Sequence, residues 1–206
     1  MGRLASLDGG ESLAWIGEGH SAAQRLLRDV ACTLKTFPDL AAFEAETGTE
    51  DYGLIVAPDL ARELGFEVSL QRLRSRLRFD GAVGLICRAW LQDEVGREVR
   101  DFYQRQHAGE LRSVKKTLAS LGQHGYEPLT AELLPEDLWA EHYRRLGVVL
   151  ANTSEEQLGA SELLRVASEE LLLNTTHARE STLGLFVGRR LDPDAPPRWP
   201  RRGFSD

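Results

Sequence analysis

The chain has 206 residues, which is enough for one α/β domain with a sizeable core. Its formal net charge of −7 and its pI of about 5.3 argue against a protein that binds nucleic acid by neutralising phosphates. The two cysteines, Cys32 and Cys87, lie in runs that indicate strands, so we expect buried thiols, no disulfide framework and a reducing, cytoplasmic location. No apolar run reaches the roughly 18 residues of a membrane-spanning helix, and Met1–Gly10 lacks the apolar core of a signal peptide.

In the first half of the chain, apolar runs bounded by turn residues alternate with stretches of helical periodicity. This alternation indicates β-α units on a largely parallel sheet. The predicted strands lie at Leu13–Gly17, Ala31–Phe37, Tyr52–Ala57 and, after a turn at Asp80–Gly81, at Ala82–Ala89. The predicted helices lie at Ser21–Val30, at Asp39–Glu46 and along Val68, Leu70, Leu73 and Leu77.

The second half is predicted to be mainly helical, with two further strands. The elements in order are a helix through Val95, Val99 and Phe102, a helix from Ser113 to Leu121, a strand at Tyr126–Leu133, a helix opened by Pro135, a helix over Ser154–Arg179 and a strand at Thr182–Leu191. We expect residues 1–191 to form one domain. Residues 192–206, rich in proline and arginine, are predicted to be an extended or disordered tail.

The most informative pattern is the segment LAWIGEGHS, from Leu13 to Ser21. It combines a short apolar strand, a G-x-G turn and a serine suited to the start of a helix. The sequence lacks H-E-x-x-H, paired C-x-x-C, G-x-S-x-G and Walker motifs, which argues against a metal enzyme, an α/β-hydrolase and a P-loop ATPase, so we expect no metal.

Together with the later part of the chain, this segment resembles the class I S-adenosylmethionine-dependent methyltransferases over residues 10–191. YGLIV, from Tyr52, is similar to the family's fourth strand, and FDG, from Phe79, replaces the usual proline and glycine before the fifth. LPEDLWAEHY, ending at Tyr143, is similar to a characteristic L-P-x-x-x-W-x-x-x-Y segment.

The resemblance implies an α/β, Rossmann-like methyltransferase fold whose mostly parallel sheet has an antiparallel last strand. It also implies S-adenosylmethionine as cofactor, bound at the carboxyl ends of the first strands, and a small molecule as methyl acceptor over the later strands. Since the methyl donor is a sulfonium, the protein mostly positions and desolvates, and no residue is singled out as catalytic. We expect no nucleic-acid or membrane partner.

Two sets of candidate site residues follow from the resemblance. The cofactor side comprises Gly17, Glu18, Gly19, Asp39 and Asp59, and the acceptor side comprises Arg88, Trp90, Trp139, His142 and Tyr143. Each set also has a purely structural interpretation. The glycines suit any tight turn, an aspartate at a helix start complements the helix dipole, and aromatic residues at helical spacing often belong to a core.

The spacing of the first strands indicates that one β-α unit is missing. Three units should separate the family's first and fourth strands, about 60 residues or more, whereas 39 positions separate Leu13 from Tyr52. In one alternative, Leu13–Gly17 is the first strand and the third, edge unit is absent, which leaves the core closed. In the other, Leu13–Gly17 is the second strand and the glycine loop is lost. We favour the first alternative and keep both open, together with a third in which an upstream segment supplies the loop.

The cofactor motifs are also degenerate. Trp15 replaces the expected strand acid and Ser21 the last glycine. In the favoured alternative, Lys35 occupies the position of the acid that binds the ribose hydroxyls, and lysine accepts no hydrogen bond; Asp39 is a nearby substitute. The competing hypothesis is therefore a catalytically inactive protein of this fold that acts as a binding or assembly partner, with the shortened sheet edge as a surface for a homodimer or another protein.

Overall fold

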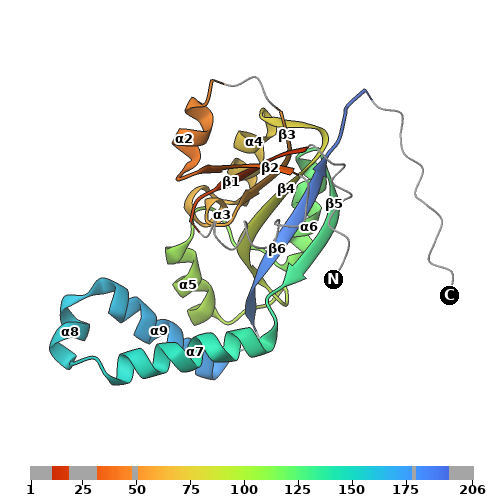
Figure 1. Cartoon of the computed structure of the whole chain (residues 1–206). Helices are drawn as coiled ribbons and strands as arrows, with labels where there is room; N and C mark the ends of the chain where they lie inside the picture. The colour runs from red at the N-terminus through yellow and green to blue at the C-terminus, as the bar shows by residue number, and fades with distance from the viewer. Residues whose placement is uncertain (1–10, 19–31, 48–50, 178–179, 195–206) are drawn as a thin grey trace.

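A computed structural model describes residues 11–18, 32–47, 51–177 and 180–194. The described strands are β1 (Glu11–Ile16), β2 (Cys32–Phe37), β3 (Tyr52–Ala57), β4 (Leu77–Trp90), β5 (Tyr126–Leu133) and β6 (Ser181–Arg190). They form one six-stranded sheet in the order β2-β1-β3-β4-β6-β5 (Figure 1). The pairs among β2, β1, β3 and β4 are parallel, while β6 runs antiparallel to both β4 and β5. The predicted fold class, a mostly parallel sheet with an antiparallel last strand, is confirmed.

The described helices flank this sheet or lie beyond its end. They are α2 (Leu40–Ala45), α3 (Leu60–Leu64), α4 (Phe66–Arg74), α5 (Arg97–Gln106), α6 (Val114–Gln123), α7 (Glu136–Ala151), α8 (Glu155–Ala160) and α9 (Glu162–His177). The predicted helix at Ser21–Val30 lies outside the described residues. The main core joins the sheet to α2, α4 and α6 through fully buried side chains, among them Phe43, Tyr52, Leu70, Leu85 and Leu121.

The position of β1 bears on the missing unit. Leu13, Ala14 and Trp15 pair with β3 on one side, and all six residues of β1 pair with β2 on the other. Within the described residues, β2 is the terminal strand of the sheet. This order is expected if Leu13–Gly17 is the first strand and the edge unit is missing. It also results if Leu13–Gly17 is the second strand and pairs with β3 after loss of the central strand, so the order agrees with both alternatives.

Two predicted boundaries were wrong. Asp80–Gly81 is not a turn before a strand, because β4 begins at Leu77 and continues through both residues. The register shifts between the pairs Tyr52–Leu77 and Leu54–Ala82, so that one residue of β3 lies opposite four of β4. Asp80 adopts a positive φ of 64°, a conformation that suits a bulge better than a regular ladder. Leu77 consequently belongs to the strand, and the preceding helix ends at Arg74.

The second error concerns the helix predicted over Ser154–Arg179, which is two helices. Ser154 begins α8 with a capping box to Gln157, but Ser161 is extended, at φ −117° and ψ 116°, and ends it. The Ser161 hydroxyl then accepts a hydrogen bond from Leu164 N at 3.4 Å, at the start of α9. A serine side chain that bonds to a nearby backbone amide competes with continuous helix.

Helices α7, α8 and α9, which we call the arm, leave the sheet after β5, extend beyond its end and return to β6 (Figure 1). A buried ion pair connects the arm to the sheet. Arg88 of β4 donates to Glu170 of α9 at 3.2 Å and to Ser181 Oγ at 3.0 Å. The hydroxyls of Tyr103 and Tyr143 donate to the same Glu170 oxygen at 3.4 and 3.2 Å. One carboxylate thus connects β4, α5, α7 and α9.

We predict that Glu170→Gln lowers the free energy of unfolding by about 2 kcal/mol, because it leaves the Arg88 guanidinium buried without its counter-ion. The Arg88 side chain is 8% exposed and that of Glu170 20%. Urea denaturation followed by circular dichroism measures the change.

The neighbouring residue provides the control. Glu169 pairs with Arg105 at 2.8 Å, but both side chains are about half exposed, so Glu169→Gln is expected to cost less than about 1 kcal/mol. Equal losses for the two variants would contradict the role given to Glu170.

Candidate functional site

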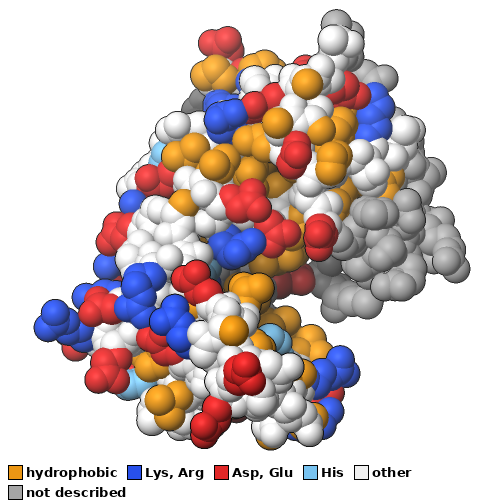
Figure 2. Space-filling model, turned by 90° about the vertical axis from the view of Figure 1, so that its left-hand side faces the viewer, with side chains coloured by type: hydrophobic (Ala, Val, Ile, Leu, Met, Phe, Trp, Pro, Cys, Tyr) orange, Lys and Arg blue, Asp and Glu red, His pale blue; other side chains and the backbone are white. Residues whose placement is uncertain are grey.

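The carboxyl ends of β1, β2 and β3 enclose a cavity of about 370 Å³. We call it the acidic cavity; it is lined by Ile16, Gly17, Glu18, Pro38, Asp39, Leu40, Asp59, Leu60, Arg62 and Glu63. Four carboxylates and one guanidinium give the lining a net negative charge. Figure 2 shows acidic side chains gathered in the middle of the face that looks to the left in Figure 1. Such a cavity suits a cationic ligand with hydroxyl groups and disfavours a phosphate.

The structure brings together four of the five residues predicted on the cofactor side: Gly17, Glu18, Asp39 and Asp59. Gly19 lies outside the described residues. Gly17 has a φ of +104°, and a Cβ built on it would lie 3.6 Å from Asp59 Oδ2. Glycine is therefore required by the backbone conformation at this turn, and its missing side chain leaves the backbone open toward the cavity.

Asp39 has two functions available to it. Its Oδ1 caps α2 by accepting a hydrogen bond from Ala42 N at 2.8 Å, whereas Oδ2 has no hydrogen bond to any described residue. Asp59 is the residue before α3 and makes no side-chain cap bond. Both carboxylates line the acidic cavity, so each has an oxygen available to accept hydrogen bonds from a ligand.

Lys35 does not line the acidic cavity. Its ammonium bonds to Glu46 Oε1 at 3.0 Å, and Glu46 also accepts hydrogen bonds from Tyr52 and Arg76. The hydrogen bonds from Tyr52 and Lys35 lower the pKa of Glu46. Burial and the neighbouring carboxylate raise the pKa of Tyr52 to about 12. The lysine is thus paired with Glu46 outside the lining of the acidic cavity, and Asp39 is the polar residue from the end of β2 that lines it.

Trp15 has a role that the sequence did not reveal. Its indole Nε1 donates to the carbonyl oxygen of Glu18 at 2.8 Å, across the turn that follows β1. The tryptophan in place of the expected acid therefore holds the backbone of this turn. The only signal for this contact in the sequence is a residue with a side-chain hydrogen-bond donor two positions before the glycine of the turn.

A second cavity, of about 430 Å³, lies where β4, β5 and β6 meet the arm. We call it the arm cavity; it is lined by Leu91, Leu133, Leu134, Glu136, Trp139, Ala140, Tyr143, Asn174, Ser181 and Thr182. Trp139 and Tyr143 stack at 5.5 Å between ring centroids with 15° between their planes. They form one wall of this cavity, and their role beside an acceptor stays a prediction.

The other predicted acceptor residues are placed differently. Arg88 lies beyond that wall, its guanidinium 3.8 Å from the ring centroid of Tyr103 and 5.1 Å from that of Trp139. Trp90 is 5% exposed and donates to Leu111 O at 2.9 Å, which makes it a core residue. His142 is exposed and meets Trp139 edge-on at 5.8 Å.

The polar groups behind the arm cavity are held in their neutral or paired forms. Burial raises the pKa of Tyr143, and the hydrogen bond between the Tyr143 and Tyr103 hydroxyls raises it further. The pKa of Tyr103 is also raised by burial. Both phenols therefore keep their protons at neutral pH and act as hydrogen-bond donors to Glu170, not as bases.

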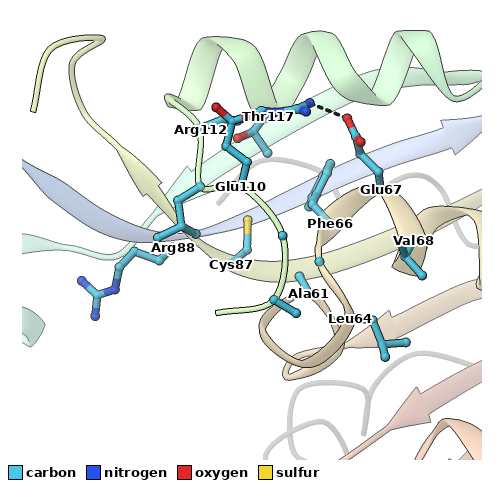
Figure 3. A pocket seen from close by; sticks show the side chains of 14 residues that line it. Ala61, Leu64, Phe66, Glu67, Val68, Cys87, Arg88, Glu110, Arg112 and Thr117 are labelled. Carbon is cyan, nitrogen blue, oxygen red and sulfur yellow. Dashed lines mark hydrogen bonds and ion pairs between the residues drawn. The ribbon is translucent and has the colours of Figure 1, made fainter. Parts of the chain in front are cut away.

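A third cavity, of about 90 Å³, lies between α3, α4 and β4 (Figure 3). The thiol of Cys87 points into it, and burial raises the pKa of this thiol to about 12. Arg112 and Glu67 pair with each other at its rim, while the Arg88 side chain runs away from it. Ligand pockets for small molecules usually enclose about 300–1,000 Å³, so this cavity is too small for a nucleoside.

Among the described residues, no group of three or more His, Cys, Asp or Glu side chains is arranged to hold a metal ion. Over the same residues, no helix combines the length and the apolar character that crossing a membrane requires.

Comparisons with known proteins identify the fold. No family model matches the sequence, and no curated protein matches it. The structure is similar to that of an S-adenosylmethionine-dependent methyltransferase from Geobacter sulfurreducens in complex with S-adenosyl-L-homocysteine, with a TM-score of 0.62, 16% identity and coverage of 88% of this chain and 85% of that one. A putative sarcosine dimethylglycine methyltransferase from Galdieria sulphuraria gives a TM-score of 0.61, 14% identity and coverage of 90% and 80%.

A third similar structure is the [4+2]-cyclase SpnF, with a TM-score of 0.62, 12% identity and coverage of 90% of this chain and 76% of that one. A cyclase and methyltransferases share this architecture, so the fold alone does not determine the reaction. The strand order and these similarities together show that the chain has the Rossmann-like fold of the class I S-adenosylmethionine-dependent methyltransferases.

Proposed function

We propose that the acidic cavity binds S-adenosylmethionine and that the protein transfers its methyl group to a small molecule. The observation that carries this proposal is the convergence of Gly17, Asp39 and Asp59 on one cavity at the carboxyl edge of the sheet. Open α/β sheets generally bind their ligands at this edge. The similar structures from Geobacter sulfurreducens and Thiobacillus denitrificans are complexes with S-adenosyl-L-homocysteine.

The residues present fit this cofactor. Asp39 and Asp59 offer carboxylate oxygens to the ribose hydroxyls, since a carboxylate only accepts hydrogen bonds. The net negative lining favours the sulfonium and ammonium charges of the ligand. Leu40 and Leu60 supply apolar surface beside these acids, and Gly17 leaves its backbone accessible. Glu18 and Asp59 would border the cationic part of the ligand.

When bound, S-adenosylmethionine supplies an electrophilic methyl group on a sulfonium. The chain's own part is to bind, orient and exclude water, because this transfer needs little proton chemistry from the protein. The acidic cavity ends at β3, the arm cavity involves β6, and only β4 lies between these strands. At about 4.8 Å per strand, the offset across the sheet is roughly 10 Å. Along the strands, β4 continues five residues past Leu85, the partner of Ala57, before it reaches the arm cavity. The proposed transfer therefore needs an acceptor that extends from the arm cavity, beside Trp139 and Tyr143, toward the end of β3.

We predict that calorimetric titration detects saturable binding of S-adenosyl-L-homocysteine to the wild-type chain, and that Asp39→Asn weakens it about tenfold. A hydrogen bond to a charged group contributes roughly 1.5–3 kcal/mol, and asparagine preserves the N-cap of α2, so folding is spared. Asp59→Asn is expected to act in the same direction.

Asp51→Asn is the matched control. Asp51 is an exposed acid directly before β3. It lies at the amino end of this strand, whereas Asp59 lies beyond the carboxyl end. Its replacement is expected to leave the affinity for S-adenosyl-L-homocysteine unchanged. No heat at millimolar ligand, or an equal effect of all three variants, would contradict the proposal and favour the inactive binding partner. Sedimentation analysis would then be expected to detect a homodimer or a hetero-complex.

A second prediction concerns the turn. Gly17→Ala is expected to lower the affinity for S-adenosyl-L-homocysteine and to reduce stability by about 1–2 kcal/mol, because the left-handed conformation is unfavourable for a residue with a Cβ. Gly159→Ala serves as control: its Cβ would meet no atom within 4 Å, so neither quantity should fall. Retained affinity in Gly17→Ala would show that this turn does not approach the ligand.

A further inference from the structure

We infer that the arm cavity selects an uncharged, mostly apolar molecule, and that this molecule is the methyl acceptor. The assignment as acceptor rests on the proposed function, whereas the selectivity follows from the cavity itself. At about 430 Å³ the cavity has the size of a site for a small organic ligand.

The walls present apolar surface that is still exposed. Leu91 is 47% exposed and Leu133 39%, and both line the arm cavity together with Leu134, Trp139 and Ala140. These side chains come from the ends of β4 and β5 and from α7. Apolar surface gathered in a concave site is favourably covered by an apolar ligand, at roughly 25 cal/mol per Å².

Most polar side chains of the lining are already engaged; the Asn174 amide is the one with no hydrogen bond to a described residue. Trp139 Nε1 donates to Thr182 Oγ1 at 3.1 Å, and that hydroxyl donates to Leu183 O at 3.1 Å. Ser181 Oγ accepts from Arg88, and the Tyr143 hydroxyl donates to Glu170. A strongly polar ligand would have to break these bonds or remain unsatisfied, and either outcome weakens its binding.

Charged ligands are disfavoured for two separate reasons. The lining contains one ionised side chain, the exposed carboxylate of Glu136, so an anion finds no counter-ion there. The aromatic wall already has a cation–π partner, because the Arg88 guanidinium lies against Tyr103 and Trp139 from beyond the lining of the cavity. Because Glu170 neutralises Arg88, the pair offers no net charge to either kind of ligand.

Three bicyclic probes of nearly equal size test this selectivity: 2-naphthol, 2-naphthoate and (2-naphthylmethyl)ammonium. Calorimetric titration is expected to give a dissociation constant for 2-naphthol at least about tenfold lower than for either charged probe, since burial of an unpaired charge is unfavourable. Equal or tighter binding of a charged probe, or no binding of 2-naphthol at millimolar concentration, would overturn the inference.

Two tryptophan variants on α7 locate the binding site. Ala140→Trp fills the arm cavity from an exposed helix position and is expected to weaken 2-naphthol binding at least about tenfold. Ala151→Trp places the same side chain at an exposed position outside the cavity and should have no effect. Unchanged 2-naphthol binding in Ala140→Trp would refute the location.

Titration of both variants with S-adenosyl-L-homocysteine keeps the two proposals distinguishable. Unchanged nucleoside affinity with lost 2-naphthol affinity supports an arm cavity that acts separately from the acidic cavity. If the wild-type chain binds 2-naphthol selectively but no S-adenosyl-L-homocysteine, the proposed methyl transfer fails while the ligand class stands.

Discussion

The contact between Arg88 and Glu170 determines how the arm lies on the sheet. Arg88 is the one charged residue in the stretch of β4 from Ala82 to Trp90, and its side chain is 8% exposed. Its Nε has no hydrogen-bond partner in the described part of the chain, so the guanidinium is not fully compensated. A buried ion pair of this kind contributes little net stability. It holds the Glu170 carboxylate in place, however, and the hydroxyls of Tyr103 and Tyr143 both donate to that carboxylate. The wall of the arm cavity takes its geometry from that arrangement.

The two larger cavities follow from the topology of the sheet. Parallel strands β1, β3 and β4 bring their carboxyl ends to one edge, and the antiparallel β6 begins at the same edge. The turns after β2 and β3 are short, and they place Asp39 and Asp59 at one end. The long excursion between β5 and β6 covers the other end with Trp139 and leucines. A polar, anionic cavity and an apolar one therefore lie at the same edge of the sheet, and the proposed transfer uses both.

The sequence predicted the sheet well, and four of its cofactor-side candidates line one cavity, because both features depend on local pattern and strand order. Tyr52–Ala57 and Tyr126–Leu133 coincide with β3 and β5, and parallel topology alone brings Gly17, Asp39 and Asp59 together. Of the acceptor-side candidates, only Trp139 and Tyr143 line the arm cavity. In a strand covered on both faces, alternation does not indicate which side chains face a ligand, so Trp90 and Arg88 could not be placed. The bulge at Asp80 and the break at Ser161 depend on single backbone conformations that tertiary contacts select.

The degenerate motifs acquire a different meaning in the structure. A lysine at the position expected for the ribose acid would oppose a cationic ligand if its charge entered the cavity. Lys35 instead bonds to Glu46, away from the lining, and the acid at the end of β2 is Asp39. Trp15 stands in place of the expected strand acid, and its indole donates a hydrogen bond to the carbonyl of Glu18. The turn is therefore held by a side-chain donor and not by a carboxylate. Both substitutions leave an acidic cavity with an accessible glycine backbone, and that is the chemistry that a sulfonium nucleoside needs. The loss of motif identity therefore does not imply the loss of the site, because the physical requirement is for carboxylates at this edge and not for a particular position in the chain.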